Sequence, residues 1–271
     1  MRGSTPCDSE EVRRYGGNTS CVVLQVGDDK PIIFDLGTGL RYFGRTQPRD
    51  GTFAGTCLLS HLHWDHTQGL PFFTPILEPG SQLDIYAPLQ EDGRPVVEAL
   101  GAFIQPPHFP ISIEHIPGTL RFHDIGDGDF PIGSAMVRSR LIPHVGNTLG
   151  YRVDTDGASF AYISDHQQPY DGSFSVTNSA RELVQGVDVL VHDAQYTADE
   201  FERKCTWGHC TVDYAVWLAI ECDVKTLVLF HHDPTRTDDA VDKMAARASE
   251  LAKDSNVTIV AAREGLVIST G

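Results

Sequence analysis

The sequence predicts an α/β fold in which two mixed β-sheets pack face to face, with helices on their outer faces. Three observations lead to this expectation. The chain has 271 residues and is 41% hydrophobic, which is enough to bury a large core. Short β-type runs dominate the first half of the chain, and strands alternate with amphipathic helices in the second half. Glycine and proline are spread evenly, without a linker or a short repeat, so we expect one domain over residues 1–271.

The expected strands are apolar runs bounded by Gly, Pro or Asp residues. In the first half they cover residues 20–26, 31–35, 56–60, 83–86 and 135–142. Residues 148–154 and 158–164 flank Asp156-Gly157, a dipeptide typical of tight turns, and therefore predict a hairpin. The second half adds strands at residues 187–191, 226–230, 257–261 and 266–269.

Helices are fewer and are expected where apolar residues recur at helical spacing. One such stripe follows Thr211, a candidate N-cap, and consists of Val212, Ala215, Val216, Ala219 and Ile220. Residues 237–252 carry a second stripe, and shorter helical patterns cover residues 95–103 and 178–185.

Charge and targeting signals narrow the function. Lys and Arg number 21 against 37 Asp and Glu, so the net charge is −16, and no basic cluster offsets it. Such a surface repels phosphate backbones, so we expect neither tRNA nor another large nucleic acid as a partner, and no membrane. Residues 1–20 lack the pattern of a signal peptide, and no apolar run approaches the ~18 residues of a spanning helix. Six cysteines without regular spacing are typical of reduced thiols, so a cytoplasmic location is expected.

The strongest chemical signal is a cluster of three histidines and an aspartate directly after an apolar strand, in the segment Ser60-His61-Leu62-His63-Trp64-Asp65-His66. On an extended backbone His61 and His63 point the same way, because side chains repeat with period two. Asp65 and His66 then turn in the opposite sense as the chain leaves the strand. This pattern can serve two metal ions, and its ligand types favour Zn²⁺, with Mn²⁺ or Fe as alternatives. The competing interpretation is a polar loop that holds three histidines by chance.

Further candidate ligands stand at the ends of other predicted strands. His144 follows the strand 135–142, and Asp165 ends the strand 158–164. His231 and His232 end the apolar strand 226–230. A single residue of this kind is more often a turn former. Three such strand ends in a chain that already contains the histidine cluster favour a shared metal centre.

These residues resemble the metallo-β-lactamase-fold hydrolases. The resemblance rests on the motif His61-x-His63-x-Asp65-His66 with His144, Asp165 and His231, and on the segments 16–20, 35–39, 162–165 and 231–234. It covers nearly the whole chain and implies a four-layer αββα sandwich with two divalent metal ions at one edge of the sheets. It also implies that His61, His63 and His144 hold one ion. Asp65, His66 and a late histidine would hold the other, with Asp165 bridging; this late histidine is His231, or His232 after a one-residue shift.

The closest resemblance is to the phosphodiesterase branch of that family, which includes ribonuclease Z. True β-lactamases carry a cysteine where this chain has Asp165, so the resemblance does not imply hydrolysis of β-lactam antibiotics. The di-iron flavoproteins of the fold carry a glutamate in the region of Asp65-His66, so redox chemistry is not implied either. The branch implies hydrolysis of a small phosphodiester, with a cyclic nucleotide as one option, by a hydroxide shared between the two metal ions. Ribonuclease Z itself is disfavoured, since only twenty residues separate His144 from Asp165 and leave no tRNA-binding arm. A homodimer is compatible with the resemblance.

Two further segments resemble the same branch. Trp207-Gly208-His209-Cys210-Thr211 resembles a Gly-His-Ser-Thr motif whose histidine is a general acid, and His192-Asp193-Ala194-Gln195-Tyr196 resembles the motif whose acidic residue, usually glutamate, orients that histidine. The implied catalytic residues are therefore Asp65, His209 and Asp193. A carboxylate facing His209 would favour a proton on its ring. The alternatives are that His209 caps a helix and Asp193 caps a turn, and aspartate has one methylene less reach than glutamate.

Other interpretations stay open at this point. Asp35, between an apolar strand and Gly37, is either a carboxylate that orients a ligand histidine or a turn former. The same metal centre would also suit hydrolysis of a lactone or a thioester. A metal-binding sensor without turnover is a third, less favoured hypothesis.

Overall fold

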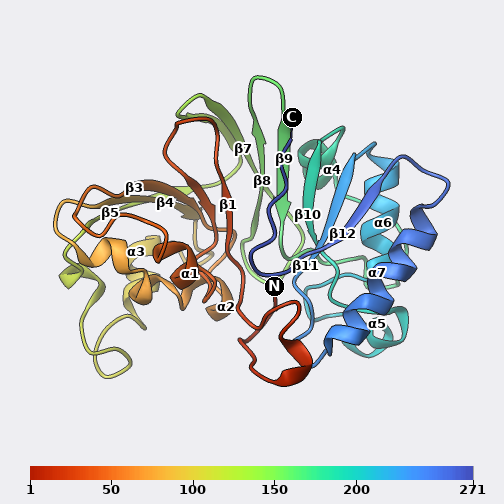
Figure 1. Ribbon diagram of the computed structural model, residues 1–271, viewed down its shortest axis with the longest axis horizontal. Coiled ribbons are helices and arrows are strands. Elements are labelled where there is room, and N and C mark those ends of the chain that lie inside the picture. Colours follow the sequence, from red (N-terminus) through yellow and green to blue (C-terminus); the bar gives the residue numbers. More distant parts are fainter. Residues whose placement is uncertain (271) are drawn as a thin grey trace.

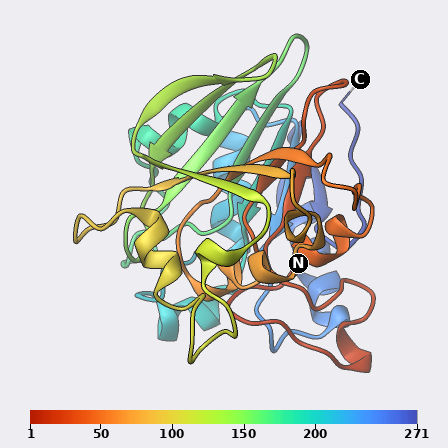
Figure 2. The same cartoon turned by 90° about the vertical axis from the view of Figure 1, so that its left-hand side faces the viewer.

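The computed structural model describes residues 1–270 as two mixed β-sheets packed face to face, with helices outside (Figure 1). The predicted fold class is confirmed. Viewed from the side of the first sheet, the orange and yellow segments of that sheet and its helices lie in front of the green and blue second sheet (Figure 2).

The first sheet has five strands in the order β1-β2-β3-β4-β5. Their bounds are Val22–Leu24, Ile32–Phe34, Ala54–Leu58, Gln82–Pro88 and Thr119–Ile125. β1 pairs with β2 in the antiparallel sense, and the other three pairs are parallel.

The second sheet has seven strands in the order β12-β11-β10-β9-β8-β7-β6. From β6 to β12 their bounds are Gly128–Ile132, Ala135–Leu141, Leu149–Asp154, Ser159–Ile163, Val189–Asp193, Thr226–Phe230 and Thr258–Ala261. Strands β9 to β12 are parallel, whereas β6 to β9 pair in the antiparallel sense. β8 and β9 form the hairpin predicted around Asp156-Gly157.

Helices cover the outer face of each sheet. α4 (Asn178–Val184), α6 (Val212–Glu221) and α7 (Asp238–Ala252) contact the second sheet, and α3 (Val96–Gly101) contacts β5. Shorter helices are α1 (Leu40–Gly44), α2 (Trp64–Thr67) and α5 (Ala198–Lys204), with 3-10 turns at Glu10–Val12, Leu70–Phe72, Thr74–Leu77 and Ile113–His115. Thr211 caps α6 as expected, because its side chain accepts the amide hydrogen of Tyr214. Within residues 1–270, no helix combines the length and the apolar character needed to cross a membrane.

Three apolar layers separate the sheets and helices. In β11, Leu227 and Leu229 pack in the layer formed with α4, α6 and α7, while Val228 and Phe230 pack between the two sheets. In β2, Ile33 faces the layer under α1 and α3, whereas its neighbours face the second sheet. Since side chains of a strand alternate, a strand covered on both faces is apolar throughout. This pattern produces the four-layer sandwich.

The structure differs from the predicted elements at several places. Residues 266–269 form no strand, because this apolar run has no partner backbone among the described residues and Val267 is exposed. β5 and β6 were not predicted, because each carries few apolar residues, Leu120, Phe122 and Ile125 in β5 and Phe130 and Ile132 in β6, and Pro131 lies within β6. α1, α2 and α5 were also not predicted: α1 and α2 have only five and four residues, and α5 has no apolar stripe.

The strand ends position the candidate site residues. In the first sheet, β2 is followed by Asp35 and β3 by the loop that contains His61. In the second sheet, Asp165 lies just after β9, Asp193 ends β10, and His231 follows β11. β7, which leads to His144, runs parallel to β9 because both are antiparallel to β8. The carboxyl ends of these strands therefore meet at one edge of the sandwich.

An apolar cavity of about 1100 Å³ opens elsewhere, between the two sheets. Val22 of β1 lines it on one side, and Val191 of β10 and Phe230 of β11 line it on the other. None of the predicted ligand or proton-donor residues contributes to its wall, so cavity volume alone does not locate the chemical site.

Candidate metal centre and proton donor

The predicted ligands of the segment 61–66 lie partly in the loop after β3 and partly in α2. His61 lies in the extended loop, and His63 is the extended N-cap of α2. Asp65 and His66 belong to the first turn of the helix and are buried, whereas Trp64 between them is 71% exposed. The change from loop to helix therefore separates the four predicted ligands into two pairs, as the sequence pattern predicts.

His61, His63 and His144 form the first group of candidate ligands. Their ligand atoms all lie within 4.8 Å of one another. Nδ1 of His63 is 2.9 Å from Nε2 of His61 and 3.4 Å from Nε2 of His144. Nδ1 of His144 donates a hydrogen bond to the carbonyl oxygen of Gly208 at 2.6 Å. This bond fixes the tautomer of His144 and leaves the Nε2 lone pair free to bind a cation.

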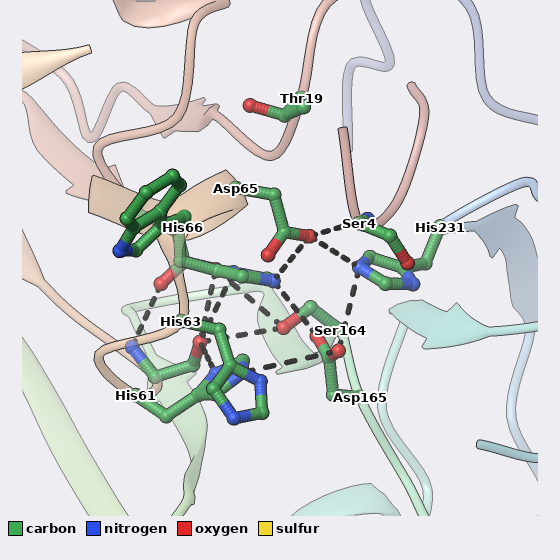
Figure 3. Close-up of polar contacts among 12 residues, drawn as sticks. Ser4, Thr19, His61, His63, Asp65, His66, Ser164, Asp165 and His231 are labelled. Carbon is green, nitrogen blue, oxygen red and sulfur yellow. Dashed lines mark hydrogen bonds and ion pairs between the residues drawn. The ribbon is translucent and has the colours of Figure 1, made fainter. Parts of the chain in front are cut away.

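Asp65, His66 and His231 form the second group. Oδ2 of Asp65 is 3.0 Å from Nε2 of His231 and 3.2 Å from Nε2 of His66. Figure 3 shows these three side chains and Asp165 pointing toward one another. The second ring nitrogen of each histidine has its own partner: Nδ1 of His66 donates to Asp35 at 2.7 Å, and Nδ1 of His231 donates to Gln195 at 3.2 Å. Both rings thus keep Nε2 toward the centre of the group.

The structure brings His231 into the group and places His232 outside it. His231 follows β11 in the left-handed backbone region, with φ of 55°. The Nε2 atom of His232 instead lies 3.3 Å from the carbonyl oxygen of Ala262 at the end of β12. Of the two alternatives left open by the sequence, the geometry favours His231 as the ligand.

Asp165 lies between the two groups. Its Oδ1 is 3.9 Å from Nε2 of His144 and 3.3 Å from Nε2 of His231. Its Oδ2 is 3.2 Å from Nε2 of His66. A carboxylate in this position can contribute one oxygen to each of two neighbouring cations.

The histidines of the first group are held neutral. Burial lowers the pKa of His61 well below its ordinary value, lowers that of His63, and lowers that of His144 to about 4. A neutral imidazole is the form that binds a metal. The second group differs, because burial alone would lower the pKa of His66 and His231, but the adjacent carboxylates of Asp65 and Asp165 outweigh it and raise both values.

Two buried atoms indicate that these residues fit a metal. Among residues 1–270, neither Nε2 of His66 nor Oδ2 of Asp165 has a hydrogen-bond partner, although they are 3.2 Å apart and fully buried. A buried polar atom without a partner costs about 1–3 kcal/mol. A divalent cation coordinated by both atoms would remove that cost, and the mixture of imidazole and carboxylate ligands suits Zn²⁺, Mn²⁺ or Fe.

The predicted proton donor and its carboxylate partner are in contact. Nδ1 of His209 donates a 2.8 Å hydrogen bond to Oδ2 of Asp193, so aspartate reaches despite its shorter side chain. Asp193 also accepts the amide hydrogens of His166 and Gln195, at 3.0 and 2.9 Å. The ring of His209 stacks on that of His231, with 4.9 Å between centroids. The pair therefore adjoins the ligand cluster.

Several contacts to the ligands were not predicted from sequence. The backbone amide of Ser4 donates to Oδ2 of Asp65 at 2.7 Å, and Gly3 lies so close to His231 that a Cβ there would be 2.2 Å from its ring. The side chains of Ser60 and Gln195 contact Nδ1 of His61 and of His231. Gln195 had a signal, its place two residues after Asp193. Backbone contacts have none, because every residue except proline carries an amide hydrogen.

Comparisons with known proteins show the family of the chain. Residues 7–232 match the family model described as a beta-lactamase superfamily domain. The chain is 27% identical over 233 residues to an uncharacterised protein of Mycobacterium tuberculosis H37Rv, covering 83% of this chain and 78% of that one. It is 25% identical over 287 residues to ribonuclease Z of Lactococcus lactis subsp. cremoris, covering 86% and 89%.

Solved structures share the fold. The metallo-beta-lactamase fold protein YhfI from Bacillus subtilis matches with a TM-score of 0.71 and 18% identity, over 98% of this chain and 94% of that one. The short form of human tRNase Z matches with a TM-score of 0.65 and 18% identity, over 99% and 96%. Yeast PDE1 matches with a TM-score of 0.67 and 11% identity, over 98% and 97%.

The expectation that tRNA and other large nucleic acids are excluded as partners is wrong. Four relatives named ribonuclease Z align with 75–86% of the chain, and human tRNase Z shares its fold. The net charge of −16 is an average over the whole surface, whereas phosphate binding depends on local charge. Cations in a cluster of histidines and aspartates would supply positive charge at the site itself, so overall acidity does not exclude a polyanion.

Proposed function

The chain belongs to the β-lactamase superfamily, and on that premise we propose that it is a phosphodiesterase that uses two divalent metal ions, with Zn²⁺ as the favoured metal. Its metal ligands are His61, His63 and His144 for one ion and Asp65, His66 and His231 for the other, with Asp165 between them. His209 is the proton donor, and Asp193 orients it.

One observation carries the proposal: Asp165 lies within 4.0 Å of histidines from both ligand groups, and the His209–Asp193 pair adjoins the same cluster. Bound metal ions would neutralise phosphate oxygens and lower the pKa of a bound water. His209 and Asp193 supply the proton for the leaving group. Asp193 accepts a hydrogen bond from Nδ1 of His209. The imidazolium form of the ring carries its second proton on Nε2, and this is the proton that His209 would give to the leaving oxygen before it returns to the neutral form.

Burial strengthens these roles. Asp165 and Asp193 are almost fully buried, so water does not compete for their oxygens and their electrostatic interactions are stronger than on a surface. The hydrogen bonds to Gly208, Asp35 and Gln195 fix the ligand rings before substrate binds. Preorganised groups of this kind stabilise developing charge without reorganisation during the reaction.

The relatives support phosphodiester chemistry. Proteins named ribonuclease Z cleave RNA, whose backbone is a phosphodiester, and they align with most of this chain. A small diester, with a cyclic nucleotide as one candidate, requires only the metal centre and the proton donor described above. Yeast PDE1 and human tRNase Z share the fold, which is compatible with either substrate size.

A second candidate is cleavage of an RNA strand. Besides the ribonuclease Z relatives, two exposed tryptophans favour it. Trp64 is 71% and Trp207 is 61% exposed, and each is adjacent in the chain to a residue of the site, His63 and Gly208. Exposed indole rings are typical platforms for stacking of nucleic-acid bases.

A substrate panel on metal-loaded protein tests the proposal. The panel contains bis(4-nitrophenyl) phosphate, 3′,5′-cyclic AMP, an RNA with a 3′ extension and an acyl lactone, each assayed with Zn²⁺ and Mn²⁺ alongside analysis of bound metal. We expect turnover of at least one diester that disappears in Asp165→Ala. Lactone turnover without diester turnover would support the lactone hydrolase instead. Bound metal with no turnover of any substrate would support a metal-binding sensor.

A further inference from the structure

Two buried glutamines follow the central carboxylate directly in the chain. Gln167 and Gln168 come two and three residues after Asp165, and both side chains are buried. Each side chain crosses to the segment 205–211, which carries His209. We call these two residues the glutamine pair.

Gln167 binds the chain just before His209. Its Oε1 accepts the amide hydrogen of Gly208 at 2.8 Å, and its Nε2 donates to the carbonyl oxygen of Cys205 at 2.8 Å. Nε2 also lies 2.5 Å from the carbonyl oxygen of Gln168. The carboxamide is thus fixed in one orientation, with its oxygen toward an amide and its nitrogen toward two carbonyls.

Gln168 binds the chain at and after His209. Its Oε1 accepts from both the amide and the hydroxyl of Thr211, at 3.1 and 2.9 Å. Its backbone amide donates to the carbonyl oxygen of His209 at 3.3 Å, and its Nε2 donates to Gly172 at 3.0 Å. Thr211 is also the N-cap of α6. The glutamine pair therefore fixes the backbone on both sides of His209.

The backbone before His209 does not fix the position of this residue by itself, because Gly208 has the conformational freedom of a glycine. Gly208 has φ of 93°, and a Cβ there would lie 2.5 Å from the ring of His144. His144 in turn donates to the carbonyl oxygen of Gly208. The position of the His209 ring relative to the ligand cluster thus depends on how the segment 205–211 is held.

We infer that Gln167 and Gln168 are positioning residues that hold the proton donor His209 at a fixed distance from Asp165 and the metal ligands. This inference rests on the proposed function. Neither glutamine needs to touch the substrate, because each acts through the backbone of residues 205–211. A displacement of about 1 Å in a catalytic group can slow a reaction ~10²-fold.

The inference predicts that the effect of substitution depends on the leaving group. A 4-nitrophenolate leaves without protonation, whereas a ribose alkoxide needs a proton from His209. We therefore expect Gln167→Leu and Gln168→Leu to lower kcat at least 10-fold on a dinucleotide diester and less than 3-fold on bis(4-nitrophenyl) phosphate. A general acid typically contributes ~10²–10⁴-fold to the rate, and a misplaced His209 would lose only part of this contribution.

Two isosteric variants refine the prediction. Gln168→Glu keeps an oxygen for both donors of Thr211 and sets its second oxygen against a single carbonyl, that of Gly172, so it should retain more dinucleotide activity than Gln168→Leu. Gln167→Glu sets a carboxylate oxygen against the carbonyls of Cys205 and Gln168, so it should lose as much activity as Gln167→Leu. The matched control is Gln185→Leu. Gln185 also bridges to a backbone carbonyl, that of Cys222, but lies at the end of α4, outside the site.

The experiment combines turnover of both diesters, metal content and amide hydrogen exchange of the peptide that contains residues 205–211. We expect at least 10-fold faster exchange of this peptide in both leucine variants, with metal content and the Gln185→Leu control unchanged. Unchanged amide exchange of this peptide in the leucine variants would overturn the inference, whether or not the wild type hydrolyses a diester. Absence of diester hydrolysis by the wild type would instead overturn the proposed function. Equal kcat losses on both diesters, or no loss on either, would also overturn the inference.

Discussion

Asp35 accepts a 2.7 Å hydrogen bond from Nδ1 of His66, and both side chains are fully buried. The same carboxylate accepts the amide hydrogen of Ser60 and the hydroxyl of Tyr162, each at 2.7 Å. Asp35 thus connects the end of β2 with the His61 loop and with β9, from which Asp165 extends. Of the two interpretations left open by the sequence, the geometry favours a carboxylate that orients a ligand over a simple turn former.

Asp35→Asn is expected to weaken metal binding about 10–100-fold, the usual effect of losing a partner that orients a ligand histidine. In either orientation of the new carboxamide at position 35, its NH₂ group would face a hydrogen-bond donor: the amide of Ser60, or Nδ1 of His66 and the hydroxyl of Tyr162. Competition with a chromogenic chelator measures the affinity. Asp84→Asn is the matched control, since Asp84 contacts Nε2 of His123 at 3.1 Å on the partly exposed β4 and β5, away from the site. Equal affinity for Asp35→Asn and the wild type would contradict this role.

Asp165→Ala is expected to reduce affinity for metal at both positions by more than ~100-fold, because it removes a direct ligand rather than an orienting partner. The reason is geometric: Oδ1 faces His144 and His231, while Oδ2 faces His66. Metal content after dialysis against limiting Zn²⁺ provides the measurement, with Asp171→Ala on an exposed loop as the control. Retention of two metal ions per chain would refute the bridging position.

The convergence of distant residues could be predicted because it follows from strand ends. Apolar runs such as 226–230 are visible in the sequence, and polar residues directly after them meet at one sheet edge when the strands are parallel. His231 and Asp165 were found in this way, and the structure brings them within 3.3 Å. The sequence pattern separated His61 and His63 from Asp65 and His66, and the loop-to-helix change at His63 is the local cause of that separation. The resemblance supplied the assignment of His144, Asp165 and the late histidine to these two groups.

The parts that could not be predicted lack a side-chain pattern. α5 has a capping box between Thr197 and Glu200 but no apolar stripe, so periodicity does not reveal it. Residues 266–269 show the reverse case, an apolar run without a partner strand among the described residues. The hydrogen bond from His144 to Gly208 joins residues 64 positions apart, one of them through its backbone, and only the folded chain shows it.

His209→Ala is expected to keep its metal and to lower kcat about 10²–10⁴-fold on a diester with an alkoxide leaving group. Asp193→Asn should act in the same direction, because Asp193 holds the Nδ1 proton of His209 through a 2.8 Å bond. Steady-state kinetics together with metal analysis separate loss of the proton donor from loss of the metal centre. Full activity of His209→Ala on such a substrate would exclude the general-acid role.

A buried histidine behind this pair should make stability depend on pH. His192 is fully buried; its Nδ1 donates to the carbonyl oxygen of Asp193 at 2.7 Å, so its Nε2 accepts from Nδ1 of His166 at 2.9 Å. Burial lowers the pKa of His192 below its ordinary value of 6.5. Below pH 6.5 the unfolded chain therefore binds a proton at His192 that the folded chain does not bind. By linkage, this residue reduces the free energy of unfolding as the pH falls through that range.

His192→Gln tests this dependence in metal-free protein, where the histidines that do not contact residue 192 titrate alike in both chains; His166, its hydrogen-bond partner, is the exception. At pH 7.5 the variant should be about 1–3 kcal/mol less stable, since buried hydrogen bonds are lost. At pH 5 the difference should be smaller, because only the wild type still carries the cost of keeping residue 192 neutral. Urea unfolding at each pH measures both values, with the exposed His108→Gln as the control substitution. A difference that grows as the pH falls would show that His192 is protonated in the folded chain, contrary to its burial and its two hydrogen bonds.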